Sequence, residues 1–282
     1  MGLRIQNNVE AFNTHRQLSS TSTAAAKAME KLSSGYRINR AADDAAGLAI
    51  SEKMRSQITG TAQAQRNAMD GISLVQTAEG ALNEVHSMLQ RVRDLKVQYQ
   101  NGTLSADDKN AIASEVSQIG LEVNDIVNNT KFIGTAVFGS NTFTFQVGAN
   151  DGETITTSSA NLSGAVNTGG LSNLTGIATV NAASAALETG GDLGAVSQID
   201  EAIKNVSKVR GDLGSIQNRL EHRLNNLATY QENLTAAESR IRDVDMAEEM
   251  TKFTKLNILQ QAGTSMLAQA NQAPQGVLSL LR

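Results

Sequence analysis

The sequence predicts a mainly α-helical protein: a long, coiled-coil-like helical bundle rod with a small β-hairpin region, in which the N- and C-terminal helices are paired. Three observations lead to this prediction. Apolar residues recur at alternating three- and four-residue spacing in both halves of the 282-residue chain. A zone rich in Gly, Ser, Thr and Asn separates the two halves. Aromatic residues make up only 3% of the chain, which suits thin helical contacts better than one large core.

The first helical half covers roughly residues 1–130 and holds two segments of the rod. One register contains Val75, Ala78, Leu82, Val85, Leu89 and Val92 and continues to Lys96 and Tyr99. A second register contains Ile112, Val116, Ile119, Val123 and Ile126. Asn101 and Gly102 separate the two segments, and Ser105 stands before two acidic residues as an N-cap would. Such stripes are buried only where other helices lie alongside them.

Residues 134–194 predict loops and short strands, because the zone is rich in turn residues. One hairpin can be placed within it. Phe143, Phe145 and Val147 alternate with polar residues, residues 148–152 supply turn chemistry, and residues 153–157 return.

The second helical half covers residues 192–273 and again carries one apolar stripe. Its members are Ile199, Ile203, Val206, Leu213, Leu220, Leu224, Leu227, Leu234 and Ile241. Pro274 is the only proline, and we expect the last helix to end there.

Apolar residues also mark both ends of the chain, where chain termini are normally polar and frayed. We predict that these residues mediate self-assembly, because little else in the chain is left to cover them. The alternative is that the two ends simply pack on each other. The residues are Ile5, Val9, Phe12, Leu18, Met29, Leu32, Met246, Met250, Phe253, Leu256, Leu259, Leu267, Val277, Leu278, Leu280 and Leu281.

The side chains that carry out catalysis or bind cofactors are scarce or scattered. The chain has no Cys, which excludes disulfides and thiolate chemistry. His15, His86 and His222 lack a second metal ligand at helical spacing, and the acidic pairs near residues 43 and 243 predict helix caps rather than a metal site. No glycine pattern forms a phosphate cradle. We therefore expect neither an enzyme nor a cofactor.

Charge and hydropathy also narrow the range of partners. A net charge of −4 argues against nucleic acid as a partner. No apolar run approaches the roughly 20 residues that span a bilayer, so we expect no membrane partner. The N-terminal residues lack the pattern of a cleaved signal peptide. If the chain is exported, we expect another route.

Several long motifs resemble bacterial flagellin. Residues 32–39 (LSSGYRIN), 42–50 (ADDAAGLAI), 66–73 (RNAMDGIS) and 77–84 (TAEGALNE) resemble the N-terminal signature of that family. Residues 233–247 (NLTAAESRIRDVDMA) resemble the C-terminal signature, and residues 270–282 fit it as well. The resemblance covers about residues 1–140 and 192–282. The middle segment is too short for the variable outer domains of many flagellins.

The resemblance implies a structural subunit of the swimming filament, built in three parts. Residues 1–44 with 243–282 would form the inner core of the filament, residues 45–139 with 192–242 the rod, and residues 140–191 a short hairpin and loop region. The implied partners are other copies of the chain, the flagellar export apparatus and its chaperone, and the filament cap and hook-junction proteins. The implied location is the extracellular filament, reached without a cleaved signal peptide.

A further implication of the resemblance concerns recognition by an animal innate immune receptor. Residues 89–98 resemble the rod stretch that this receptor binds in some flagellins, and Gln90, Arg91, Leu95 and Glu115 match it. Lys96 replaces a small residue that is common there, and Asp94 is shorter than the usual Glu.

Two other classes of protein remain as alternatives. A hook–filament junction protein shares the terminal signatures, and a cytoplasmic coiled-coil scaffold would explain the heptads but not the apolar ends. An enzyme would need an unrecognised site within residues 140–191, a segment that contains no His.

Overall fold

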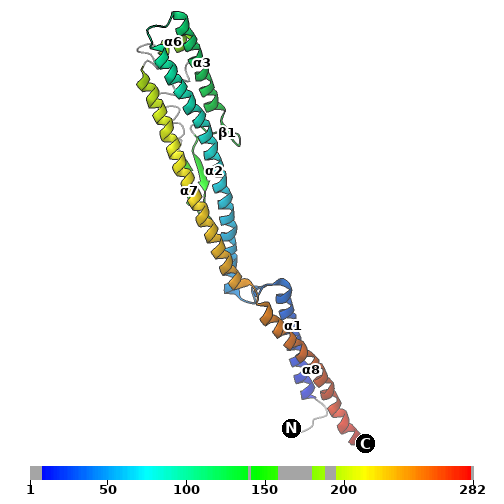
Figure 1. Cartoon of the computed structure of the whole chain (residues 1–282). Helices are drawn as coiled ribbons and strands as arrows, with labels where there is room; N and C mark the ends of the chain where they lie inside the picture. Colours follow the sequence, from blue (N-terminus) through cyan, green and yellow to red (C-terminus); the bar gives the residue numbers. More distant parts are fainter. Residues whose placement is uncertain (1–7, 139–140, 158–179, 188–194, 281–282) are drawn as a thin grey trace. The chain divides into compact units, whose positions relative to one another are not determined.

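The computed structural model describes residues 8–138, 141–157, 180–187 and 195–280. The helices are α1 (Val9–Ser34), α2 (Ala45–Tyr99), α3 (Ala106–Asn129), α6 (Val180–Leu187), α7 (Val196–Arg242) and α8 (Met246–Leu280). The strands are β1 (Lys131–Phe132), β2 (Thr135–Ala136), β3 (Phe143–Gln146) and β4 (Thr154–Thr157). The predicted mainly helical fold class is confirmed (Figure 1).

The chain forms two compact units, which are described separately below. One unit contains Met1–Gln57 and Asn233–Arg282. The other contains Ile58–Glu232. Helices α2 and α7 each have residues in both units.

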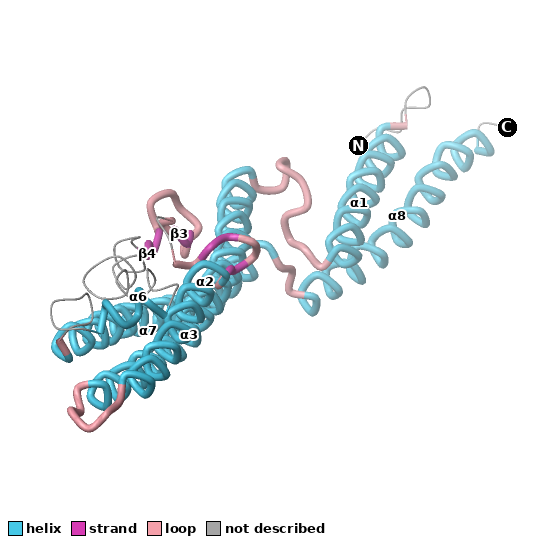
Figure 2. The backbone as a smooth tube through the Cα atoms, turned by 90° about the horizontal axis from the view of Figure 1, so that it is seen from above, coloured by secondary structure: helices cyan, strands magenta, loops and turns pink. Residues whose placement is uncertain are grey.

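A single apolar core runs through the unit of residues 58–232. It joins α2, α3 and α7, and the members predicted from the sequence stripes are buried there: Val75, Leu82, Val85, Leu89, Val92, Ile112, Val116, Val123, Ile199, Val206, Leu213 and Leu220. Figure 2 shows these three helices together in this unit. The apolar spacing therefore predicted the helices of this unit, which is called the rod below, and the faces that they bury.

The predicted hairpin is confirmed as β3 and β4, which pair antiparallel with Phe143 opposite Thr157. Two side chains connect it to the long helices. Asn67 Nδ2 on α2 donates to the Gln146 carbonyl (3.0 Å), and Arg223 Nε on α7 donates to the Val147 carbonyl (2.8 Å). The hairpin is thus fixed to both helices by hydrogen bonds to its backbone.

Two elements within residues 130–194 were not anticipated. β1 and β2 form a second, very short antiparallel hairpin. Helix α6 lies in the zone for which we expected loops, and it packs against α3. Its sequence contains four alanines, which favour a helix, and its Ala183, Ala186 and Leu187 are buried in the core. The remainder of that zone, residues 139–140, 158–179 and 188–194, lies outside the described residues.

Local capping explains where the helices begin and end. Ser105 and Asp108 form a capping box at the start of α3, as the sequence predicted. Asp44 accepts a hydrogen bond from the Gly47 amide and Asp245 from the Ala247 amide, so these acidic residues cap helices. The two helical halves of the chain contain breaks that we did not expect, between α1 and α2 and between α7 and α8. Gly35 adopts a φ of 75° and ends α1.

The expected end of the last helix at Pro274 is wrong, because α8 continues to Leu280. Proline has no amide hydrogen, so within a helix it leaves the carbonyl four residues earlier without its usual donor. That carbonyl belongs to Ala270, and it accepts a hydrogen bond from Asn8 Nδ2 at 2.7 Å. Asn8 also caps α1 by accepting from the Ala11 amide. One side chain therefore starts α1 and supplies a donor where Pro274 removes one.

Candidate functional site

The terminal helices α1 and α8 pack side by side (Figure 1), and the side chains that α1 buries fully are small. The buried residues of α1 are Thr21, Ala25 and Ala28. On α8, Gly263 faces Leu18, and a Cβ atom added there would lie 3.2 Å from Leu18 Cδ1. Small side chains let the two helix backbones approach closely. Leu18 itself is only half-buried at this contact.

Many large apolar side chains of this pair are exposed. Phe12 is 71% exposed and Val9 58%. On α8, Ile258 is 61% exposed and Met266 59%. A phenylalanine at this exposure gains only a small part of the free energy that full burial would provide.

The predicted self-assembly residues fall into three groups. Leu18, Leu32, Phe253, Leu256 and Leu267 are half-buried. Val9, Phe12, Met29, Met246, Met250 and Leu259 are exposed. Ile5 and Leu281 lie outside the described residues, as do the side chains of Val277, Leu278 and Leu280.

Ile258 and Met266 are exposed apolar residues that the sequence reading missed. It followed one stripe along α8, whereas apolar residues occupy more than one face of this helix. Counting apolar residues around the whole helix would have found them.

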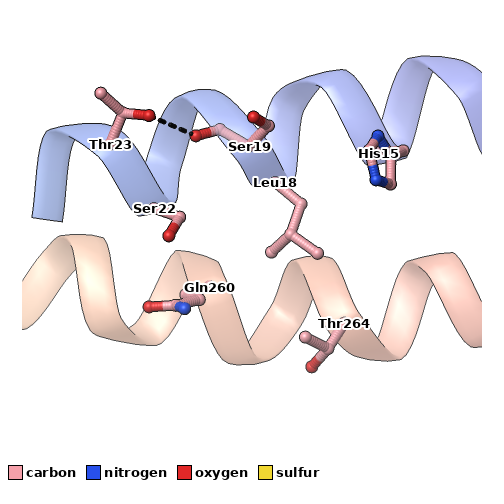
Figure 3. A pocket seen from close by; sticks show the side chains of 7 residues that line it. All are labelled: His15, Leu18, Ser19, Ser22, Thr23, Gln260 and Thr264. Atoms are coloured by element: carbon pink, nitrogen blue, oxygen red, sulfur yellow. Dashed lines mark hydrogen bonds between the residues drawn. The ribbon is translucent and has the colours of Figure 1, made fainter. Parts of the chain in front are cut away.

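A shallow groove of about 380 Å³ lies between α1 and α8 (Figure 3). Most of the side chains that line it carry a hydroxyl, an amide or an imidazole: His15, Leu18, Ser19, Ser22, Thr23, Gln260 and Thr264. Figure 3 shows Leu18 directed from α1 toward α8. Carboxylates are missing from this lining, so the groove lacks the oxygen ligands that Mg²⁺ or Ca²⁺ requires.

The segment between α1 and α2 is tied to the junction of α7 and α8. The Arg37 amide donates to the Arg242 carbonyl (2.7 Å), and Arg37 Nη2 donates to the Ile241 carbonyl (2.6 Å). Arg242 pairs with Glu52 at 2.6 Å and lies over the Tyr36 ring at 5.0 Å. Segments from the N-terminal and C-terminal parts of the chain are thus joined by hydrogen bonds and an ion pair within this unit.

Hydrogen bonds in this junction lower the pKa of two carboxyl groups. The Arg242 guanidinium lowers the pKa of Glu52, and the Arg40 amide lowers the pKa of Asp43. Both effects stabilise the charged forms of these groups.

The four rod residues predicted to contact an immune receptor do not share one surface. Gln90 and Arg91 are exposed, and Arg91 pairs with the half-buried Glu115 at 2.6 Å. Leu95 is only 2% exposed and belongs to the core.

Lys96 is the largest polar side chain buried in the rod, with 2% of its surface exposed. Its Nζ donates to the carbonyl of Leu187, the last residue of α6, and lies 5.7 Å from the centre of the Tyr99 ring. A cation at the C-terminal end of a helix is favourable. Burial nevertheless lowers the pKa of Lys96. The side chain holds α6 to α2.

No group of three or more potential metal ligands occurs among residues 8–138, 141–157, 180–187 and 195–280. In the same part of the chain, no helix combines the length and apolarity that a membrane span requires.

Comparison with known proteins shows matches over nearly the whole chain. Residues 5–142 match the family described as "Bacterial flagellin N-terminal helical region", and residues 196–281 match "Bacterial flagellin C-terminal helical region". A flagellin of Halalkalibacterium halodurans is 51% identical over 280 residues, 99% of each chain. A flagellin of Bacillus subtilis is 50% identical over 305 residues, 99% of this chain and 100% of that protein. A crystal structure of Bacillus cereus flagellin matches with a TM-score of 0.47 and 28% identity, over 61% of this chain and 94% of that chain.

A mainly helical fold that leaves large apolar side chains exposed on α1 and α8 is typical of a structural protein that assembles with other polypeptide chains. The chain belongs to the bacterial flagellin family. It is a structural subunit that polymerises into the extracellular flagellar filament, and it is not an enzyme.

Proposed function

We propose that the large apolar side chains exposed on α1 and α8 form the surface through which copies of this flagellin contact one another in the filament. The observation that carries this proposal is the 71% exposure of Phe12, a bulky aromatic side chain on a well-formed helix. Val9, Met29, Met250 and Leu259, each about half exposed, extend the same surface.

The energetics of burial support this assignment. Burial of one large apolar side chain contributes about 1.5–3 kcal/mol. Several such side chains per copy offset the loss of rotational freedom and the ordering of the chain ends. Small side chains between α1 and α8 make this possible, because they leave the large ones free for neighbouring copies.

We extend the proposal to Ile5, Val277, Leu278, Leu280 and Leu281, which continue the apolar pattern in sequence. In this reading, residues 1–44 with 243–282 form the filament core. Residues 45–139 with 192–242 form the rod, and residues 140–191 form the short hairpin and loop region. Limited proteolysis of monomer and filament tests this division: the core segments should become protected on assembly.

The exposed apolar side chains of α1 and α8 also matter for export. We propose that the export chaperone and the export apparatus receive the chain through its apolar terminal helices, without cleavage of a signal peptide. The filament cap and the hook-junction proteins are the proposed contacts at the two ends of the filament. Mass spectrometry of filament subunits tests whether the chain is exported without cleavage, because peptides from residues 1–16 should then be present.

We also propose that an animal innate immune receptor contacts the exposed Gln90 and Arg91 and the half-buried Glu115, while the buried Leu95 supports the helix beneath them. The Arg91–Glu115 pair presents a guanidinium and a carboxylate together on the surface. Arg91→Ala should lower receptor activation by the monomer without changing its helicity. Unchanged activation would remove these residues from the proposal.

The assembly surface is tested by Phe12→Ala, with Ser20→Ala on the same helix as the matched exposed control. Purified monomers are seeded with filament fragments, and the critical concentration is measured by sedimentation. We expect Phe12→Ala to raise the critical concentration about tenfold or more, because the variant lacks one aromatic side chain that the filament would bury. Equal critical concentrations for the two variants would contradict the proposal.

A further inference from the structure

The turn between β1 and β2 places an isoleucine in an unfavourable backbone conformation. Lys131 pairs with Ala136 and Phe132 with Thr135, which leaves Ile133 and Gly134 as a two-residue loop. Their φ angles are 49° and 80°, as a type I′ turn requires. Gly, Asn and Asp suit such positions, whereas a β-branched residue there is a true outlier. Among the described residues, Ile133 is the only one other than glycine with a positive φ.

The Ile133 side chain also has the largest exposed fraction of any large apolar residue within the described segments, at 85%. Its immediate surroundings are well anchored. Phe132 packs against the core, and Val137 and Phe138 are buried within it. The Val137 amide donates to the Thr130 carbonyl at 3.1 Å and continues the ladder. The turn therefore presents one apolar side chain to solvent beside residues that pack into the core.

In the monomer, neither feature of Ile133 contributes to stability. A single exposed apolar residue is ordinary on a protein surface. A β-branched residue held at positive φ costs free energy, and such strain persists where a function uses the residue. Asparagine at this position would relieve the strain and remove the exposed apolar surface together. The backbone strain and the exposed apolar side chain at the same residue point to a role outside the monomer.

We propose that Ile133 is an assembly contact, which inserts into an apolar surface of a neighbouring copy of this flagellin in the filament. The chain polymerises into a filament, and the contacts of a helical filament join two different patches of each copy. A rigid, protruding side chain loses little conformational freedom on binding, which favours such a role. The proposal requires filament formation but does not depend on the surface of α1 and α8.

The first test is Ile133→Asn, whose effects on monomer and filament should have opposite signs. The thermal midpoint of the monomer should stay unchanged or rise, because the strain is relieved. The critical concentration of seeded polymerisation should rise about tenfold, since one apolar contact is lost. Ile133→Val and Thr135→Asn serve as controls, and both should assemble with critical concentrations close to that of the wild type. An unchanged critical concentration for Ile133→Asn would overturn the proposal.

The second test uses the absence of cysteine from the chain, which makes a thiol introduced at position 133 unique. The Ile133→Cys protein is treated with a maleimide as monomer and as filament. We expect labelling to be at least about tenfold slower in the filament, because the neighbouring copy covers the side chain. Equal rates would overturn the proposal even if Ile133→Asn assembled poorly.

The two assembly proposals can fail separately. If Phe12→Ala impairs assembly and Ile133→Asn does not, only the Ile133 contact is refuted. If Ile133→Asn impairs assembly and Phe12→Ala does not, the Ile133 contact stands and the surface on α1 and α8 must be redrawn.

Discussion

The rod and the terminal helix pair use apolar residues in opposite ways. The rod buries its large aliphatic side chains, and Leu82, Leu89 and Leu213 are at most 1% exposed. Helix α1 instead buries only Thr21, Ala25 and Ala28 fully, and Phe12 on α1 and Ile258 on α8 are more than 60% exposed. The rod therefore completes its core within one chain. Under the proposed function, neighbouring copies in the filament cover the apolar side chains of the terminal pair, so the two regions should respond differently to the same kind of mutation.

The largest effect should follow deletion of residues 277–282. The deletion removes four apolar residues from the proposed assembly surface, so the critical concentration should rise at least about a hundredfold. Circular dichroism should show that the helicity and the thermal midpoint of the rod are unchanged. Normal seeded assembly of the truncated chain would contradict the assembly role of these terminal residues.

Leu89→Ala should instead destabilise the monomer through its rod. Leu89 is 1% exposed in the rod core, so its truncation should lower the free energy of unfolding by about 2–5 kcal/mol. Urea denaturation of the monomer measures this loss, with Gln90→Ala as the adjacent exposed control. A loss under about 1 kcal/mol would mean that the rod is loosely packed and that the contrast with the terminal pair is overstated.

Lys96→Met tests the buried charge in the rod through its pH dependence. Burial lowers the folded-state pKa of Lys96, so near that pKa the unfolded chain binds more protons than the folded chain. The free energy of unfolding of the wild type should therefore rise relative to Lys96→Met as the pH increases toward about 10.4, the ordinary lysine pKa. Parallel pH profiles for the two proteins would show that burial does not affect the titration of this group.

The smallest effect should appear at the pair of the half-buried Arg242 and the exposed Glu52. The pKa of Glu52 is lowered in the folded state, so its contribution is present above the ordinary value and lost as the pH falls through the lowered one. Glu52→Gln should increase hydrogen exchange slightly in residues 35–52 at neutral pH, and the difference from the wild type should vanish in acid. A difference that persists in acid would assign the effect to packing instead.

Sequence periodicity predicted the rod well, because its helices bury one continuous face and the spacing of Leu82, Leu89 and Val92 records that face. The β3–β4 hairpin was equally accessible, since alternation at Phe143 and Phe145 is a local signal. Pro274 was misread, because the donor that satisfies the Ala270 carbonyl comes from Asn8, far away in sequence. The turn at Ile133 was missed, because isoleucine is not a residue that predicts a turn and Gly134 alone did not place one.

The amino-acid order alone determined the helices, the apolar faces of the rod, the hairpin and the family signatures, because these depend on neighbours within a few residues. The tertiary structure decided which terminal apolar residues stay uncovered, where Lys96 finds its carbonyl and how Asn8 allows α8 to pass Pro274. These depend on which segments, far apart along the chain, approach each other. Periodicity shows that a helix has an apolar face. Only packing shows whether the same chain covers it.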